Sequence, residues 1–135
     1  MKKAILLLTL LFVFQLSVSQ NKNAYVIYNA KGKKVSYKKM LKNLKGKEVV
    51  LFGESHNNAI AHWLQFEVTL DLFKTNKLIL GAEMFEADNQ TPLNDYLSGK
   101  IDNKGLDTLA RLWKNYKTDY APLVDFAKTN NLNFV

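Results

Sequence analysis

The stretch that decides the fold is residues 48–85, which read EVVLFGESHNNAIAHWLQFEVTLDLFKTNKLILGAEMF. A continuous apolar run at residues 48–52 ends abruptly in the polar turn of residues 53–58, which is typical of a parallel strand buried on both faces. Residues 59–74 have the apolar spacing of a helix. A second apolar run follows at residues 77–85. Strand, helix and strand in this order predict a right-handed βαβ unit with parallel strands.

The flanking sequence predicts further short elements. On the N-terminal side, residues 24–28 are expected to form a strand and residues 29–33 a turn. Ser36 is a suitable N-cap for a short helix that Gly46 closes. On the C-terminal side we expect helices from Thr91-Pro92 to Gly99, at residues 106–115 and at residues 119–129, and then a third strand at residues 132–135.

The predicted fold class is therefore α/β, a βαβ unit with parallel strands and flanking helices. Two strands and part of a third bury little apolar surface for their size. We therefore interpret residues 20–135 as the N-terminal part, or fragment, of a larger α/β domain. A small complete α/β domain is the alternative.

The first residues have the pattern of a secretory signal peptide. Lys2 and Lys3 precede the apolar run 4–16, and the small residues 17–19 provide a cleavage site. A membrane anchor is the alternative, but the run is short for a bilayer span. The chain contains no cysteine, which excludes disulfides, thiolate metal sites and lipid anchoring through an N-terminal cysteine. We expect an exported protein of the periplasm or cell envelope, with residues 1–19 removed.

The net charge of +7 is unevenly distributed. Residues 22–47 contain nine lysines and no acid, whereas twelve acids and eight bases follow from Glu48 onward. A basic stretch can bind nucleic acid or an anionic membrane surface. Export argues against nucleic acid as a partner, and the sequence favours a solvated lysine-rich segment.

Polar residues follow both predicted buried strands. Glu54 follows the first strand and Glu83 the second, each just after a glycine that allows close approach of backbone or ligand. In open parallel sheets, ligands bind beyond the carboxyl ends of the strands. His56 lies two residues after Glu54, and His62 and Gln65 share a face of the next helix. These five side chains are expected to meet at one cleft.

Such a group of side chains has three chemical uses. Glu54, His56 and Glu83 could bind a divalent metal such as iron or zinc. The same three residues could perform general acid/base catalysis, with the pKa values of the two carboxyls separated by burial and mutual repulsion. The group could also hold a polar part of a larger ligand. The residues alone leave these alternatives open.

Several motifs in order resemble one known family. They are Gly53-Glu54-Ser55-His56, His62-Trp63-Leu64-Gln65, Gly81-Ala82-Glu83-Met84-Phe85, Trp113 and Tyr120-Ala121-Pro122-Leu123. Together they resemble the ChaN-like family of haem-binding, iron-regulated proteins, in the superfamily of TIKI-type proteases and erythromycin-esterase-like hydrolases. The resemblance extends from Tyr25 to the end of the chain.

The resemblance implies a haem- or iron-handling protein of the cell envelope, in which paired subunits enclose haem and envelope uptake components are partners. It implies that His56, His62, Gln65 and Tyr120 face the cofactor. Haem iron needs an axial ligand, for which histidine, tyrosine or methionine is suitable, and the sequence does not assign it. The alternative from the same superfamily is a hydrolase that uses Glu54, His56 and Glu83.

Overall fold

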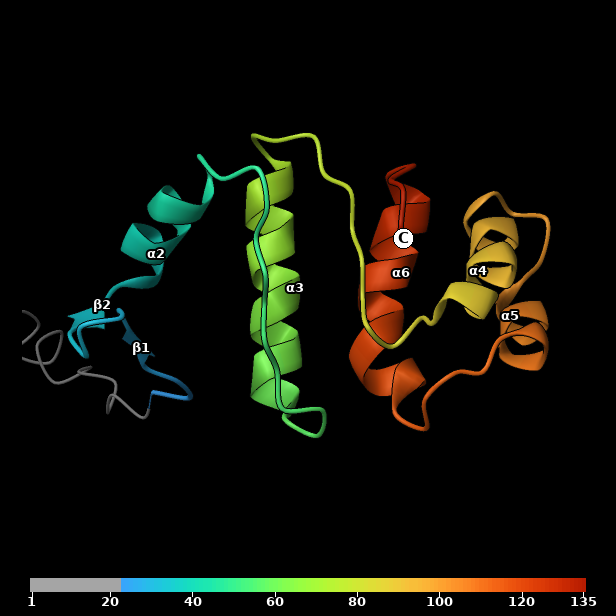
Figure 1. Cartoon of the computed structure of the whole chain (residues 1–135), viewed down its shortest axis with the longest axis horizontal. Coiled ribbons are helices and arrows are strands. Elements are labelled where there is room, and N and C mark those ends of the chain that lie inside the picture. The colour runs from blue at the N-terminus through green and yellow to red at the C-terminus, as the bar shows by residue number, and fades with distance from the viewer. Residues whose placement is uncertain (1–22) are drawn as a thin grey trace, which may run out of the picture.

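The computed structural model of this 135-residue chain describes residues 23–135. The predicted signal peptide, residues 1–19, lies outside the described residues. The described part begins with an antiparallel hairpin of β1 (Ile27–Tyr28) and β2 (Lys34–Val35), at one end of the molecule in Figure 1. The sequence predicted the first strand and the turn. It missed β2, because a two-residue strand beside two lysines has no alternating apolar pattern.

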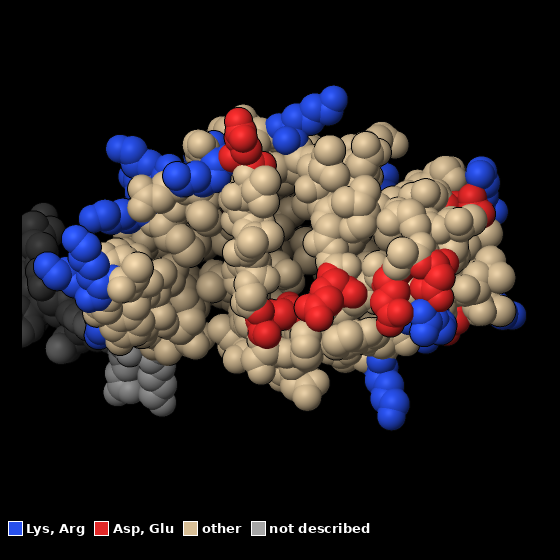
Figure 2. Space-filling view, viewed as in Figure 1, with Lys and Arg blue, Asp and Glu red and all other residues tan. Residues whose placement is uncertain are grey.

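Helix α2 (Tyr37–Leu44) follows the hairpin and begins as predicted at Ser36, whose hydroxyl accepts a 3.2 Å hydrogen bond from the Lys39 amide. The Tyr37 hydroxyl donates to Asp71 Oδ2 at 3.0 Å and so ties α2 to α3. Basic side chains without acidic ones cover this end of the face in Figure 2, whereas both signs occur over the rest of it.

Helix α3 (Ala59–Phe73) lies in the middle of the molecule and confirms the predicted central helix (Figure 1). Asn58 caps it, since its side-chain oxygen accepts hydrogen bonds from the Ile60 and Ala61 amides at 3.0 and 3.1 Å. The cap matters for the site because it fixes where the polar turn of residues 53–58 ends and the first helical turn begins.

The predicted pairing of residues 48–52 with residues 77–85 is not observed. Both segments are extended and run in the same direction in Figure 1, but a cleft separates them. Among the backbone hydrogen bonds of residues 23–135, none involves residues 48–54. Leu51 is consequently 91% exposed. An apolar run indicates that a segment is suited to burial, but it does not specify the neighbour that buries it.

One parallel contact does form, between the second segment and the C-terminal residues. Leu80 and Phe134 make an isolated parallel bridge, in which the Leu80 amide donates to the Asn133 carbonyl at 2.9 Å and the Val135 amide donates to the Leu80 carbonyl at 2.8 Å. The predicted strand at residues 132–135 is thus reduced to one bridge. In coarse terms the fold is α/β, with several helices and little paired strand.

The remaining helices form the other half of the molecule. They are η1 (Ala87–Asn89), α4 (Gln90–Leu97), α5 (Asn103–Leu109), the π-helix η2 (Tyr116–Tyr120) and α6 (Ala121–Thr129). Gly99 ends α4 as predicted, because its φ of 77° favours glycine. The predicted helix 106–115 is wrong in its bounds. Asp102 caps α5 earlier, and Ala110 turns extended at its end, so Leu109 is exposed.

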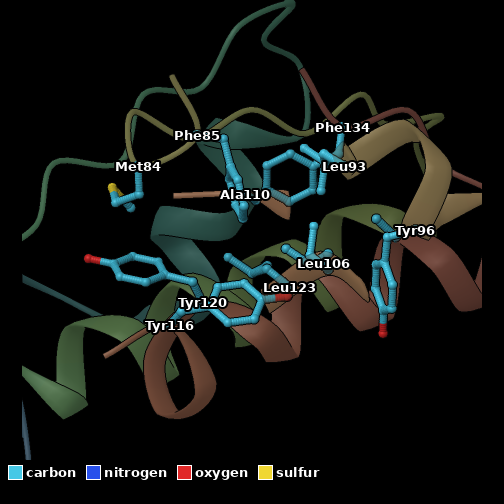
Figure 3. Close-up of a cluster of buried hydrophobic side chains, with 12 residues drawn as sticks. Met84, Phe85, Leu93, Tyr96, Leu106, Ala110, Tyr116, Tyr120, Leu123 and Phe134 are labelled. Carbon is cyan, nitrogen blue, oxygen red and sulfur yellow. The ribbon is translucent and has the colours of Figure 1, made fainter. Parts of the chain in front are cut away.

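The hydrophobic core lies mainly in this half, where α4, α5 and α6 meet the segment after residue 82 (Figure 3). Leu93, Leu106 and Val124 are fully buried at its centre. Met84 and Phe85 are buried in it, and the Phe85 ring lies edge-on to Tyr116 and Phe134. Packing on this core therefore fixes the positions of η2 and of the turn at Glu83. No helix within residues 23–135 has the length and apolarity needed to cross a bilayer.

Candidate functional site

The centre of the candidate site is the Glu54 carboxylate, whose side chain is only 7% exposed. The Tyr120 hydroxyl donates a 2.8 Å hydrogen bond to Glu54 Oε1. His62 Nδ1 lies 3.0 Å from Glu54 Oε2, and His56 Nδ1 lies 3.5 Å from Oε1. The structure thus brings together three residues from the turn after residue 52 and the start of α3, and joins them to a tyrosine 66 positions further on.

His62 is enclosed by protein, with 4% of its side chain exposed. Its Nε2 donates to the His56 carbonyl at 3.1 Å and lies 3.7 Å from Asp119 Oδ2. The contact between Nδ1 and Glu54 is close but outside the angular range of a hydrogen bond. A proton on His62 Nδ1 or on Glu54 Oε2 makes this contact attractive. His62 therefore lies between two carboxylates and fixes the loop that carries His56.

Two residues of this cluster, Asn115 and Asp119, were not predicted from the sequence. The Asn115 amide donates to the His56 carbonyl at 2.8 Å and to Asp119 Oδ2 at 2.7 Å. Asp119 lies in the π-helix η2 and Asn115 is the N-cap residue of that helix, a form often found at functional sites. Their spacing of four residues just before Tyr120 was the available signal, since such residues share one side of a helical turn.

His56 is the member of the cluster that remains open to solvent, with 47% of its side chain exposed. Its ring lies edge-on to Trp113, with 4.8 Å between centroids. Its backbone carbonyl accepts hydrogen bonds from both His62 and Asn115. The imidazole therefore has a fixed backbone, an aromatic wall and a carboxylate beside one ring nitrogen.

Glu83 and Gln65 join Glu54 and His56 in lining one cleft of about 620 Å³ between the two extended segments. Glu83 is exposed. Gln65 Oε1 is buried and has no hydrogen-bond partner within residues 23–135. Four of the six sequence-predicted residues therefore line the cleft, whereas His62 and Tyr120 are absent from its lining.

The two glycines expected to allow close approach differ in their surroundings. A Cβ on Gly81 would lie 3.0 Å from the Val135 carbonyl oxygen, so the strand contact is close there and a larger residue would require the Val135 backbone to shift. A Cβ on Gly53 would meet nothing within 4 Å. The close approach is thus between backbone segments at Gly81, and within the described residues Gly53 is open.

Two tyrosines of η2 are buried at the site but differ in their hydrogen bonding. Burial, followed by the hydrogen bond to the Glu54 carboxylate, raises the pKa of Tyr120 to about 12. Burial also raises the pKa of Tyr116, whose hydroxyl has no partner within residues 23–135. Both phenols are therefore neutral at physiological pH, and the Tyr120 hydroxyl acts as a hydrogen-bond donor.

The arrangement supports proton transfer and ligand binding through one accessible imidazole. Residues 23–135 contain no group of three or more His, Cys, Asp or Glu side chains arranged to hold a metal ion. The expected metal site of Glu54, His56 and Glu83 is therefore not assembled in this part of the chain. The accessible groups are His56 and Glu83, and the buried ones are Glu54, His62 and Asp119.

Comparison with known proteins agrees with these motifs. Residues 40–135 match the family described as haem-binding uptake, Tiki superfamily, ChaN. Neither a curated protein nor a solved structure gives a significant match. The match includes every candidate residue named above, from Glu54 to Tyr120, and covers most of the described chain. The chain therefore belongs to the ChaN family of the Tiki superfamily, the haem-binding uptake family.

Proposed function

We propose that this chain is an exported haem-binding protein of iron uptake, in which His56 would hold the haem iron. The observation that carries the proposal is that His56 is half exposed while its Nδ1 faces the Glu54 carboxylate. Metal-bound histidines usually donate their second ring N–H to a carboxylate or carbonyl, which fixes the ring and increases its basicity. The donor set thus fits haem.

The other residues suggested by the family resemblance have different roles in this proposal. His62 is enclosed and contacts Glu54, Asp119 and the His56 carbonyl, so it positions His56. Tyr120 is a protonated donor to Glu54, which disfavours it as a phenolate ligand. Trp113 supports the His56 ring from the side. When bound, haem supplies the iron that an uptake protein carries.

Haem titration of the full chain, followed by visible absorption, tests the ligand assignment. We expect His56→Ala to abolish the shifted absorption band of bound haem, and free imidazole to restore it in His56→Gly. Glu54→Gln should weaken haem binding about 10–100-fold, because the carboxylate orients the ring. Asn57→Ala, at an exposed position in the same turn, is the matched control. A His56→Ala protein with unchanged affinity and spectrum would exclude His56 as the ligand.

Paired subunits and envelope uptake components belong to the same proposal. The His56 side chain is half exposed, so a second copy of the chain could approach a haem that His56 would hold. Sedimentation of the protein with and without haem checks this. We expect the mass to double on loading, and a haem-loaded monomer would contradict the pairing.

A hydrolase is the second candidate, and one observation favours it. Asp119, His62 and Glu54 form a buried row of alternating acid and imidazole that ends beside the accessible His56. Such a row could move a proton to or from a water molecule in the cleft that Glu83 also lines. Hydrolysis of ester or peptide substrates that is lost in Glu54→Gln, with haem binding unchanged, would favour this candidate.

The sheet arrangement of the two extended segments and the export of the protein extend the proposed function. We propose that residues 48–52 and 77–82 are strands of one parallel sheet in a larger α/β domain, of which residues 20–135 are the N-terminal part. Their common direction and the unpaired backbone of residues 48–54 support it. We further propose that residues 1–19 are a signal peptide that directs the protein to the periplasm or envelope, on the sequence pattern described above.

A further inference from the structure

The end of the molecule formed by the hairpin and α2 is strongly cationic. Residues 23–47 contain eight lysines and no acidic residue. Six of these lysines are exposed on the hairpin and α2: Lys31, Lys33, Lys34, Lys38, Lys39 and Lys42. Among the described residues, none of the six forms an ion pair. Figure 2 shows this end as basic side chains without acidic ones.

The hairpin adds apolar side chains to this basic surface. The strand register pairs Tyr28 with Lys34 and Ile27 with Val35. Because side chains alternate along a strand, Val26, Tyr28 and Lys34 lie on one face of the hairpin. That face is open: Tyr28 is 56% exposed and Val26 is exposed as well, whereas Ile27 and Val35 on the other face are partly buried. The surface is therefore cationic, aromatic and aliphatic at once.

We propose that this lysine end, defined as the hairpin face of Val26, Tyr28 and Lys34 together with the other five exposed lysines, docks on an anionic phospholipid surface. Clustered lysines are attracted to acidic headgroups. Tyrosine is favoured at the level of the headgroups, where its ring and hydroxyl meet different environments. An exposed valine beside it gains from contact with the acyl boundary, as in other surface-bound proteins.

The same lysines would also attract nucleic acid, but two features favour lipid. Single-stranded nucleic acid is bound by several aromatic side chains that stack on successive bases. The hairpin face carries one exposed tyrosine, and its neighbour Val26 is aliphatic. The candidate site around Glu54 lies at the start of α3 and involves none of these lysines, so docking is independent of ligand binding.

Co-sedimentation with vesicles tests the proposal. The full chain is mixed with vesicles of phosphatidylcholine alone or with 30% phosphatidylglycerol, on the order of what polybasic segments need. The test variant is Lys31→Gln/Lys33→Gln/Lys34→Gln. The control, Lys104→Gln/Lys114→Gln/Lys117→Gln, removes the same charge from exposed positions at the other end. Any contribution of residues 1–22, including that of Lys2, Lys3 and Lys22, is the same in all of these proteins and cancels in the comparison between variants.

We expect binding to the anionic vesicles only, weakened on the order of a hundredfold by the hairpin triple variant and little by the control. Tyr28→Ser should weaken binding further at salt concentrations that screen the lysines. Equal losses in both triple variants would mean that net charge alone acts, and the docking surface would be wrong. Failure to bind anionic vesicles, together with lysine-dependent binding to a single-stranded DNA oligonucleotide, would replace lipid with nucleic acid.

Discussion

Tyr120 and Glu54 are 66 positions apart in the sequence and share a 2.8 Å hydrogen bond in which the Tyr120 hydroxyl donates to Glu54 Oε1. This bond joins the π-helix η2 to the turn that follows the first extended segment. It leaves His56, which lies two residues after Glu54, as the accessible imidazole of the cluster. Because the two residues are so far apart in the sequence, their contact fixes the site only when the helical half of the molecule is folded.

Removing the Tyr120 hydroxyl should therefore lower stability, whereas removing the Tyr116 hydroxyl should not. Tyr120→Phe leaves the buried Glu54 oxygen without its donor, which costs about 1–3 kcal/mol. The Tyr116 hydroxyl is buried without a partner, so Tyr116→Phe should be neutral or stabilising by about 1 kcal/mol. Urea unfolding of both variants measures the difference. Equal changes in unfolding free energy for the two variants would show that the hydrogen bond from Tyr120 to Glu54 does not contribute to stability.

The stability of the chain should fall as the pH rises above 10. Burial and the Glu54 carboxylate raise the pKa of Tyr120 from 10.0 to about 12. The folded state holds this proton more tightly than the unfolded state, so the stabilisation is complete below pH 10 and is lost between pH 10 and 12. Burial and Asp125 raise the pKa of Tyr96 to about 12 in the same way.

Urea unfolding of the unmodified chain and of Tyr120→Phe at pH 8, 9.5 and 11 isolates the contribution of Tyr120. The gap in unfolding free energy between the two proteins should narrow as the pH rises, because only one of them has this phenol to ionise. Tyr96→Phe is the control for the second buried phenol. A difference in unfolding free energy that stays constant across this pH range would contradict the raised pKa of Tyr120.

Much of the site could be predicted from the sequence, because each apolar run is associated with a glycine and an acid, and both histidines follow the first run. Glu54, His56, Glu83 and Gln65 do line one cleft. The division into buried and accessible members could not be predicted, since it depends on long-range contacts from the π-helix η2 and its N-cap residue: Asn115 to the His56 carbonyl and Asp119 to His62. Helical propensity does not distinguish that form from an ordinary α-helix.

The fold was predictable where local chemistry decides it and less so where long-range pairing does. Ser36 and Gly99 mark helix ends through a side-chain hydrogen bond and a φ angle, and both predictions are confirmed. The neighbours of residues 48–52 depend on contacts with distant segments, and the predicted pairing is not observed within residues 23–135. Apolar composition indicates that a strand is suited to burial, but it does not specify which segment packs against it.

The two histidines should differ in their effect on stability. His62→Ala removes the buried neighbour of Glu54 and Asp119 and the hydrogen bond to the His56 carbonyl, and leaving buried polar groups without a partner costs about 1–3 kcal/mol. His56→Ala changes a half-exposed side chain and should stay within about 0.5 kcal/mol. Thermal unfolding of the two variants tests this. A His56→Ala protein that melts as early as His62→Ala would show that both residues are structural.

Glu54 and Glu83, the carboxylates associated with the two extended segments, should also differ in their effect on stability. Glu54→Gln alters a buried acceptor of Tyr120 and a neighbour of His62, and we expect a loss of about 1–3 kcal/mol. Glu83 is exposed, so Glu83→Gln should be within about 0.5 kcal/mol of the unmodified chain. Chemical unfolding of the pair is the measurement. A destabilised Glu83→Gln protein would indicate a structural role for this carboxylate.

Alanine should be tolerated at Gly53 and harmful at Gly81. At Gly81 the new Cβ would lie 3.0 Å from the Val135 carbonyl oxygen and push apart the only parallel contact that residues 23–135 form. At Gly53 it would meet nothing, so the reduced freedom of the unfolded chain should stabilise the protein by about 0.4–1 kcal/mol. Urea midpoints of the two variants should therefore move in opposite directions. A stabilised Gly81→Ala protein would mean that the contact with Val135 yields without cost.

Hydrogen exchange tests whether residues 49–53 are an unpaired strand. Their amides make no backbone hydrogen bond within the described chain, so they should exchange nearly as fast as in an unstructured peptide. The amides of Leu80 and Val135 donate to carbonyls at 2.9 and 2.8 Å and should be protected, which provides an internal control. Mass spectrometry of peptides covering residues 48–54 and 78–82 reads both segments in one experiment.

If a polypeptide strand fills the cleft between them, protection must appear in both segments together, because that strand has two edges. Strong protection of residues 49–53 in the chain studied alone would contradict the unpaired state, and protection of only one segment in a completed sheet would contradict the strand between them.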